Sequence, residues 1–321
     1  MIEHTFDVVN SARSYGFKVL CAARDHAGNP REPAAAMGYG CGDQGRERGE
    51  AVPERRATTP AAFYDDLAAS YDRMFPDWDA SSRRQGDVLD ALIAGRLGPG
   101  PRSILDCAVG IGTQLLGLAA HGHAMVGSDV SGVAVRRALQ ECRRRGVRAG
   151  LAPADMRALP FADGAFDAVV CADNALPHLL TAGDVVAALG EMRRVTRPGG
   201  LVLVTTRDYD TLRAERPATA PLQLARAAGE VTVTFQLWEW WPDGERYDLR
   251  HFQVRGEVTG EDERWRVEQR RTAYWALTRA ELSGFARRAG LAAPEWRLPG
   301  ETGFFQPVLL ARVPARDPSS G

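Results

Sequence analysis

The chain has 321 residues, 45% of them hydrophobic and 25% charged, which is enough to bury the core of one large domain or of a domain with a cap. Its 40 basic and 41 acidic residues leave a formal net charge of −1, so no positive field gathers nucleic acid or an anionic membrane. The composition therefore predicts a globular protein and counts against a nucleic-acid-modifying enzyme.

The five cysteines form no C-x-x-C pair and have no histidine at metal-ligand spacing, so we expect neither a metal site nor a disulfide framework. No apolar stretch approaches ~20 residues, the length of a membrane span. The N-terminus carries Glu3 and Asp7 where a signal peptide has a basic start and an apolar run. These features predict a cytoplasmic protein that has no membrane partner.

Residues 1–60 are expected to be a disordered or loosely docked leader. Residues 24–60 are dense in Arg, Gly, Pro, Glu and Ala and carry too few large apolar side chains to offset the entropy of ordering. Residues 1–23 hold a short apolar pattern that fits a docking strand or helix, and fits equally an over-long assignment of the start.

Folded sequence is expected to begin near Pro60, with two helices before the first strand. In the first helix, apolar residues recur at spacings of one, three and four: Phe63, Leu67, Tyr71, Met74 and Phe75. The second helix continues through Gln85, Leu89 and Leu92 to the break at 98–100, where Gly-Pro-Gly stops it. We expect these helices to form a lid.

Strands and helices then alternate, which is typical of a parallel sheet covered by helices on both faces. The predicted elements are strand 103–107, helix 113–121, strand 123–128, helix 131–145, strand 147–151, strand 166–171, helix 182–196 and strand 200–206. Helix 278–289 and strands near 293–297 and 305–312 complete the sheet. The sequence thus predicts an α/β fold with a Rossmann-like, mostly parallel, seven-stranded sheet.

From about residue 229 the apolar residues alternate with polar ones, which predicts antiparallel strands ending with 264–274. This region reads as a small β insertion within the α/β fold. The predicted domains are therefore a core with lid at 61–210, an antiparallel cap at 211–276, completion of the core sheet at 277–313, and a tail at 314–321.

The most informative run is S-I-L-D-C-A-V-G-I-G-T-Q at 103–114, because it reads as strand, glycine turn and helix. Gly110 and Gly112 let the backbone turn sharply and approach a ligand, and the amides at the start of the helix point to the same place. Asp129 ends the next apolar segment, 23 residues after Asp106, where a carboxylate can accept both hydroxyls of a ribose. The pattern predicts a nucleotide pocket.

This run resembles the first motif of class I S-adenosylmethionine-dependent methyltransferases, D-x-G-x-G-x-G, with Ala108 in place of the first glycine. The resemblance implies S-adenosyl-L-methionine as cofactor. Asp106 and the turn would face its methionine part, Asp129 its ribose, and Asp155 with Met156 its adenine. The predicted cofactor-binding residues are Tyr71, Asp106, Ala108, Gly110, Gly112, Asp129, Val130, Asp155, Met156 and Cys171. Asp155 can instead be a solvated loop acid.

The segments C-A-D-N-A-L-P-H-L at 171–179 and T-R-D-Y-D at 206–210 resemble those of the glycine and sarcosine N-methyltransferase group, over roughly residues 61–313. The resemblance implies that Asn174 and Arg207 hold the carboxylate of an amino-acid substrate, aided by Tyr64 and Tyr209. A guanidinium suits bidentate capture of a carboxylate. Arg207 paired with Asp208 or Asp210, and Asn174 as a turn cap, are the structural alternatives.

The predicted catalytic residues are Asn174, His178 and Asp173. Asp173 adds an acid where the group more often has glycine, which can orient a cationic amine or guanidine, or cap the next helix. His178 is either a buried, hydrogen-bonded histidine or, for a hydroxyl or acidic carbon acceptor, a base. Tyr64 and Tyr71 can close over the sulfonium, whose charge an aromatic face attracts.

The sequence therefore predicts methyl transfer to a nitrogen of a small amino-acid-like molecule, by in-line displacement. O- or C-methylation of another small molecule, and a protein that binds the cofactor without transferring its methyl group, stay open as alternatives. A nucleic-acid methyltransferase is disfavoured because no N-P-P-Y-like tetrapeptide follows the fourth strand. The partner is a small-molecule substrate, and a homo-oligomer is left open.

Overall fold

The computed structural model describes residues 58–227, 230–259 and 262–315, all of which fall within one compact unit of residues 54–321. The prediction of a leader lies outside the described residues, apart from 58–60, with which the first helix begins. The domain boundaries drawn from the sequence stay a prediction.

A seven-stranded sheet forms the core of the unit, in the order β10-β11-β5-β4-β1-β2-β3. The strands are β1 Ser103–Asp106, β2 Ala124–Asp129, β3 Ala149–Pro153, β4 Phe166–Cys171, β5 Thr196–Thr205, β10 Ala292–Arg297 and β11 Val308–Arg312. β11 runs antiparallel to both of its neighbours, and the pairs among β1 to β5 are parallel. The predicted fold class is confirmed.

Helices cover both faces of this sheet. Successive strand residues point to opposite sides, so the apolar strands present side chains on both faces that must be buried. Leu105 and Val169 pack with α5 and α7 in one apolar cluster, whereas Ile104 and Val170 pack with α2, α3 and α4 in another. The helices are α2 Trp78–Leu97, α3 Thr113–Ala119, α4 Gly132–Arg144, α5 Ala182–Val195 and α7 Arg279–Arg288. All five were expected from the sequence.

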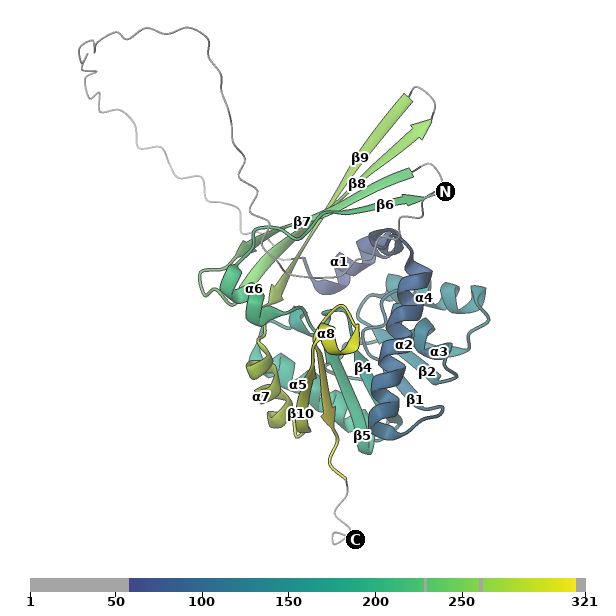
Figure 1. Ribbon diagram of the computed structural model, residues 1–321, viewed down its shortest axis with the longest axis vertical. Coiled ribbons are helices and arrows are strands. Elements are labelled where there is room, and N and C mark those ends of the chain that lie inside the picture. The colour runs from purple at the N-terminus through teal and green to yellow at the C-terminus, as the bar shows by residue number, and fades with distance from the viewer. Residues whose placement is uncertain (1–57, 228–229, 260–261, 316–321) are drawn as a thin grey trace, which may run out of the picture. The chain divides into compact units, whose positions relative to one another are not determined.

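A second sheet of four antiparallel strands follows β5 in the chain, in the order β6-β7-β8-β9. Its strands are β6 Gln223–Ala227, β7 Glu230–Trp240, β8 Arg246–Thr259 and β9 Asp262–Trp275. Helix α1, Pro60–Leu67, lies between this sheet and the seven-stranded core (Figure 1). The sequence predicted the antiparallel strands but missed β6 and the short helix α6, Tyr209–Glu215.

The N-terminal lid differs from the prediction of one helix through residues 63–75. Helix α1 ends at Leu67, and a separate turn of 3-10 helix, η1 Tyr71–Met74, follows. The break falls at Ser70, whose hydroxyl donates a 2.7 Å hydrogen bond to Gln253 Oε1 while its carbonyl accepts one from Gln253 Nε2. A buried contact with β8 therefore replaces the helical hydrogen bonds that a continuous helix would make here.

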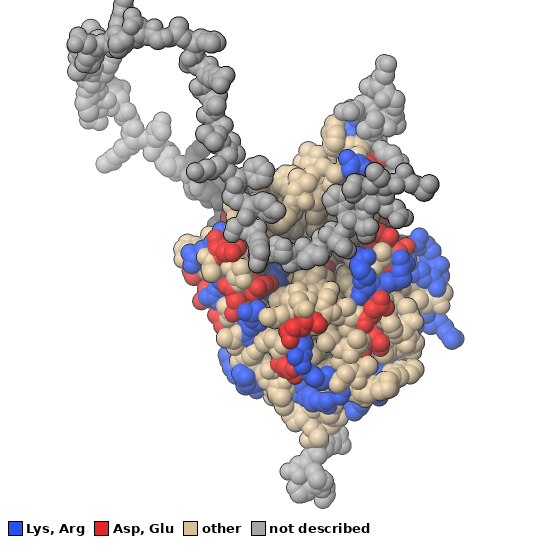
Figure 2. Space-filling view, in the orientation of Figure 1, with Lys and Arg blue, Asp and Glu red and all other residues tan. Residues whose placement is uncertain are grey.

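Charged side chains of both signs are interspersed over the face that Figure 2 presents. None of the helices that the structure describes is both long and apolar enough to cross a membrane.

Candidate functional site

The glycine turn after β1 lies beside the end of β2. Gly110 and Gly112 have φ of 51° and 102°, values that an L side chain adopts only with strain, whereas Ala108 is not among the described residues with positive φ. The backbone amide of Gly110 donates a 2.9 Å hydrogen bond to Asp129 Oδ2. The alanine therefore replaces the first glycine of the motif at a position that does not need one.

Asp129 ends β2 and joins the turn to the start of α4. Its Oδ1 accepts from the backbone amide of Ser131 at 2.9 Å, and burial raises the pKa of its carboxyl. Ser131 in turn donates to Asp65 of α1, so the lid helix reaches the same place. The neighbouring Val130 is 44% exposed. Each carboxylate oxygen of Asp129 keeps capacity for a further donor.

Asp106, at the end of β1, has an unused acceptor in the interior. Its Oδ1 accepts from the amide of Ala108 at 3.3 Å, but its Oδ2 is buried and has no hydrogen-bond partner among the described residues. Burial raises the pKa of this carboxyl to about 7. Since buried polar atoms are rarely left unpaired, this oxygen marks a place for a ligand group or water that donates.

Two of the predicted cofactor residues lie in environments that the sequence did not anticipate. Both carboxylate oxygens of Asp155 accept from the guanidinium of Arg157, the shortest contact being 2.6 Å, and this ion pair lowers the pKa of Asp155. Cys171 is fully buried and packs with Cys107 in an apolar core cluster. Met156 packs, partly buried, against the same apolar cluster.

The loop after β4 carries the predicted catalytic pair in a strained backbone. Asp173 and Asn174 have φ of 55° and 63°, the left-handed region, which costs a non-glycine residue roughly 1–3 kcal/mol. Thr205, at the end of β5, holds both residues: its hydroxyl accepts from the amide of Asp173 at 2.9 Å, and its carbonyl from the amide of Asn174 at 3.2 Å. The neighbouring strand thus fixes the loop.

The carboxylate of Asp173 is partly buried between the lid and the core. Tyr71 of η1 donates to its Oδ2 at 2.6 Å, and Gln306 Nε2 lies 3.5 Å from its Oδ1. Burial raises the pKa of Asp173, while the bond from Tyr71 and the charge of Arg207 lower it. Gln306 had no predicted role; it comes from the loop before β11 and accepts from Thr205 Oγ1 at 2.7 Å.

Arg207, just after β5, is a half-buried cation that has no carboxylate within 4 Å among the described residues. Its Nη1 donates to the phenol of Tyr247 at 2.6 Å, and its guanidinium carbon lies 4.9 Å from the ring centre of Trp238 and 5.1 Å from that of Tyr274. The neighbouring acids Asp208 and Asp210 pair with Arg279 instead. The alternative of a local ion pair for Arg207 is therefore wrong.

Asn174 stands next to this cation. Its Oδ1 accepts from the backbone amide of Arg207 at 3.0 Å, and its Nδ2 is buried without a partner in the described part of the chain. The ends of two adjacent strands thus join the side chain of Asn174 to the backbone of Arg207. Neither the guanidinium of Arg207 nor the amide nitrogen of Asn174 has an anionic hydrogen-bond acceptor among the described residues.

His178 is 9% exposed and lies beneath α1. Its Nε2 is 3.0 Å from the hydroxyl of Tyr64, its Nδ1 is 3.2 Å from Thr272 Oγ1, and the ring of Tyr274 lies 4.1 Å away. Burial, and then the charge of Arg207, lower the pKa of His178 to about 3, so the imidazole is neutral at physiological pH. The structure places it as a buried, hydrogen-bonded histidine that ties the lid to β9.

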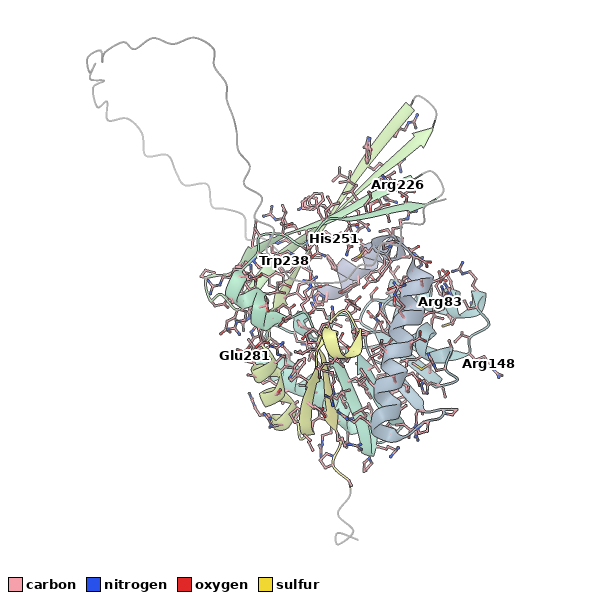
Figure 3. The ribbon with its side chains drawn as sticks, in the orientation of Figure 1. Arg83, Arg148, Arg226, Trp238, His251 and Glu281 are labelled. Carbon is pink, nitrogen blue, oxygen red and sulfur yellow. The ribbon has the colours of Figure 1, made fainter. Side chains whose placement is uncertain are left out.

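Tyr209 is 1% exposed and reaches the site through another residue, since its hydroxyl lies 3.2 Å from that of Tyr247. The second sheet contributes side chains that the sequence did not single out as site residues: Trp238, Tyr247, Thr272 and Tyr274. Figure 3 places Trp238 and His251 where this sheet meets the rest of the unit, and Arg226 farther out. No group of three or more metal-ligating side chains occurs in residues 58–227, 230–259 and 262–315.

The sequence profile of a methyltransferase domain matches residues 104–200, which hold the glycine turn, Asp129 and the loop after β4. The glycine/sarcosine N-methyltransferase of Parasynechococcus marenigrum is 32% identical over 151 residues, covering 47% of this chain and 52% of that protein. The demethylmenaquinone methyltransferase of Beutenbergia cavernae is 39% identical over 148 residues, covering 45% and 56%. The matches thus span about half the length of these relatives.

The fold is similar to that of an amino pentose methyltransferase from Micromonospora echinaspora solved with S-adenosylmethionine bound. The TM-score is 0.57 at 20% identity, over 77% of this chain and 96% of that one. The matched domain, the relatives and the fold agree with the motif after β1. Residues 104–200 match a methyltransferase domain, and the relatives and the fold support a class I S-adenosylmethionine-dependent methyltransferase whose cofactor is S-adenosylmethionine.

Proposed function

We propose that the protein transfers a methyl group from S-adenosylmethionine to a nitrogen of a small amino-acid-like molecule. The observation that carries this proposal is Arg207, a cation held by phenol and aromatic rings rather than by an acid. A half-buried cation with no carboxylate within 4 Å among the described residues is costly to desolvate, so a ligand that supplies a carboxylate would stabilise the site.

The residues after β1 and β2 suit the cofactor. The unpaired Asp106 Oδ2 can accept from its ammonium group, and Asp129 can accept from its ribose hydroxyls. Gly110 leaves open space where any other residue would place a Cβ, so the backbone can approach a ligand closely. When bound, the cofactor supplies a methyl group on a positively charged sulfur.

On the acceptor side, the guanidinium of Arg207 and the unpaired Nδ2 of Asn174 both donate hydrogen bonds, which matches a carboxylate and not a cation. Charge-assisted hydrogen bonds of this kind contribute about 1.5–3 kcal/mol each. We therefore assign the carboxylate of the substrate to this pair.

Asp173 is assigned to the acceptor amine. Its carboxylate interacts electrostatically with Arg207 on one side and bonds to Tyr71 on the other, and Tyr71 is itself close enough to Asp129 to feel its charge. Asp173 thus lies between the cofactor residues and the carboxylate-binding pair. Ionised Asp173 can accept the proton of an ammonium group, leaving the nitrogen lone pair free to attack the methyl carbon as the sulfur–carbon bond breaks.

Alignment of the two reactants is the main contribution that the protein needs to make. Aligned binding lowers the barrier of a two-substrate reaction by ~7–11 kcal/mol. A neutral amine needs no strong base, which is consistent with the absence of a well-poised histidine, since the pKa of His178 is lowered to about 3.

Methylation of carbon or oxygen is the second candidate, favoured by the resemblance to the demethylmenaquinone methyltransferase. Such an acceptor must lose a proton, which for an alcohol is harder to remove than that of an ammonium group and for a phenol about equally hard. Among the predicted catalytic residues only Asp173 can take it, because His178 stays neutral and is a weak base. Carbon or oxygen methylation does not require a carboxylate on the acceptor, so it gives no role to the charge of Arg207.

The test combines binding and turnover. Isothermal titration with S-adenosylmethionine and S-adenosylhomocysteine measures cofactor affinity, and release of S-adenosylhomocysteine is then followed across amino acids, guanidino acids, amino sugars and phenols. Turnover of acids bearing an amine supports the proposal. Turnover of phenols or quinols alone would favour the second candidate, and tight binding with no turnover would point to a protein that keeps the cofactor without transferring its methyl group.

A further inference from the structure

The four-stranded sheet buries both polar and apolar side chains on the side facing α1. The buried polar residues are Thr232, Thr234, His251, Gln253 and Thr272, each no more than 4% exposed. The buried apolar and aromatic residues of the same side are Trp238, Tyr247, Leu249 and Tyr274, which pack with Tyr209 of α6. On the opposite side, the register aligns Leu224, Val233, Val254 and Val267 in one row across all four strands. Phe235 and Phe252 form the next pair, stacked at 4.8 Å. We call this second side the outer face.

Large apolar side chains on the outer face are exposed to solvent. Val267 is 65% exposed, Trp265 50%, and Leu224 and Leu237 41% each. These are four of the eight large apolar residues that the structure describes as exposed, and they gather on one face of one sheet. Contiguous apolar patches of this kind are rare on monomers and mark interaction surfaces.

The lid does not cover the outer face. Within the described ranges, the hydrogen bonds that connect this sheet to α1, η1 and the turn at His178 all come from the inner side. Arg270 donates to the carbonyl of Asp66, Thr272 contacts His178, and Gln253 contacts Ser70. Figure 1 shows β8 and β9 extending away from the core, beyond α1.

Most charges on the outer face lie at its end nearest α6 and are paired within the sheet, whereas Arg226, in register with Val231, is exposed near the opposite end. Arg250 bonds to Glu239 at 2.7 Å, and Arg271 bonds to Asp248. The apolar rows therefore adjoin a border whose charges already balance. Such a surface offers nothing to attract a strongly charged partner, but it is complementary to itself under a two-fold axis.

We propose that the outer face of β6–β9 is a dimer interface, on which a second copy of this chain packs sheet against sheet. Four strands ~4.8 Å apart and 11 residues long in β7, at ~3.3 Å per residue, span roughly 700 Å². That area is close to the ~800 Å² per partner of a stable interface. An apolar centre beside a polar border is the usual anatomy of such interfaces, and this inference is independent of the reaction proposed above.

Leu224→Glu tests the proposal, with Leu298→Glu as its matched control. The two leucines are 41% and 40% exposed, but Leu224 lies in the apolar row, whereas Leu298 lies just before α8, Pro299–Thr302, away from this sheet. Sedimentation equilibrium of the full chain from 1 to 100 µM gives the dissociation constant of the dimer. We expect the wild type and Leu298→Glu to be dimers at 10 µM, and Leu224→Glu to dissociate about 100-fold more readily, because two buried charges enter the interface.

A wild type that stays monomeric at 100 µM would overturn the proposal, and so would a Leu224→Glu variant as dimeric as the wild type. Circular dichroism and titration with S-adenosylhomocysteine report whether each variant is folded. Should Leu224→Glu misfold, Val267→Lys repeats the test at the most exposed position of the face. A stable dimer whose dissociation constant neither variant changes would place the interface elsewhere.

Discussion

The hydroxyl of Tyr71 donates a 2.6 Å hydrogen bond to Oδ2 of Asp173, linking the lid to the strained loop after β4. Two opposing influences act on the carboxyl: burial raises its pKa, and the bond from Tyr71 lowers it. The lid therefore does more than cover the site, since its closure favours the ionised form of the residue assigned to the acceptor amine.

Tyr71→Phe is expected to shift the pH dependence of turnover. Loss of the donor removes an influence that lowers the pKa of Asp173, so this pKa rises and the ionised form appears only at higher pH. A charge-assisted hydrogen bond of about 1.5–3 kcal/mol corresponds to about one to two pH units. The measurement is the acidic limb of kcat/KM against pH, using an acceptor that the wild type methylates.

Asp173→Asn is the companion variant, because it cannot ionise. Its profile should lose the acidic limb, with kcat reduced ~100-fold, the lower end of the ~10²–10⁴-fold that a single proton acceptor typically contributes. If Tyr71→Phe keeps the wild-type limb, or if Asp173→Asn keeps both limb and rate, Asp173 does not take the proton.

Arg207→Ala is expected to raise KM for a carboxylate-bearing acceptor by at least ~10-fold while leaving affinity for the cofactor within about twofold. The reason is that the guanidinium faces the acceptor side, with Tyr247, Trp238 and Tyr274, and not the glycine turn. Arg207→Lys keeps the charge but not the planar fork, and should recover only part of the loss.

Arg279→Ala is the control for Arg207, since Arg279 pairs with the adjacent Asp208 and Asp210 and contacts no predicted substrate residue. It should lower stability slightly and leave KM unchanged. Equal losses of cofactor and acceptor affinity in Arg207→Ala would refute its role as a carboxylate ligand.

Asp129→Asn should weaken S-adenosylhomocysteine binding ~10-fold or more, whereas Asp155→Asn should change it less than about threefold. Asp129 has spare acceptor capacity beside the glycine turn, but Asp155 is already bonded to Arg157 through both oxygens. Isothermal titration of the two isosteric variants compares them directly. An equal loss in Asp155→Asn would mean that this ion pair opens when the adenine binds.

His178→Gln is expected to make the protein less sensitive to acid. The pKa of His178 is lowered from 6.5 to about 3 in the folded state, so below pH 6.5 the unfolded chain binds a proton that the folded chain does not. Stability that is present above pH 6.5 is therefore lost as the pH falls, by up to ~1.4 kcal/mol per pH unit. His178→Gln has no imidazole, so it does not lose stability in this way as the pH falls.

Urea unfolding at pH 7.5, 6.5 and 5.5 measures the difference, and kcat at pH 7.5 is followed in parallel. The gap in unfolding free energy between wild type and His178→Gln should narrow from pH 6.5 to 5.5. A constant gap would mean that the buried imidazole titrates normally, and a 10³-fold loss of kcat would restore His178 as a base.

The fold could be predicted because its signals are local. Apolar runs of four to six residues between turns predicted the strands of the core, and Gly98 marked the end of α2. Where a distant contact decided the structure, local patterns failed: the helical spacing across Ser70 was real, yet its bonds to Gln253, 183 residues away, break the helix. Helix α6 carried no clear apolar period, because Tyr209 is its only buried residue.

Only the site residues at the ends of core strands could be predicted to lie close together. Asp129, Asn174 and Arg207 follow strands, so their proximity could be inferred from strand order alone. Tyr247 and Tyr274 reach Arg207 from β8 and β9, and no pattern in the sequence tells which aromatic residues of an antiparallel sheet face inward. No local sequence pattern predicted a role for Gln306, which is recognised only by its contacts with Thr205 and Asp173 in the structure.

Helices α2 and α3 approach each other closely at Gly86 and Gly117, which gives a prediction on stability alone. A Cβ on Gly86 would overlap the backbone of Gly117, whereas a Cβ on Gly95 of the same helix would meet nothing within 4 Å. Gly86→Ala should therefore destabilise the protein by about 1–3 kcal/mol, because the two backbones must separate.

Gly95→Ala is the matched control and should stabilise α2 by about 0.5–1 kcal/mol, since alanine loses less entropy than glycine on entering a helix. Thermal unfolding of both variants checks the opposite signs, at roughly 2–4 °C per kcal/mol for a unit of this size. Because Gly112 is the N-cap of α3, separating the helices also moves the glycine turn, so Gly86→Ala should weaken S-adenosylhomocysteine binding while Gly95→Ala does not. Equal stability of the two variants would mean that the helices are not in contact at these glycines.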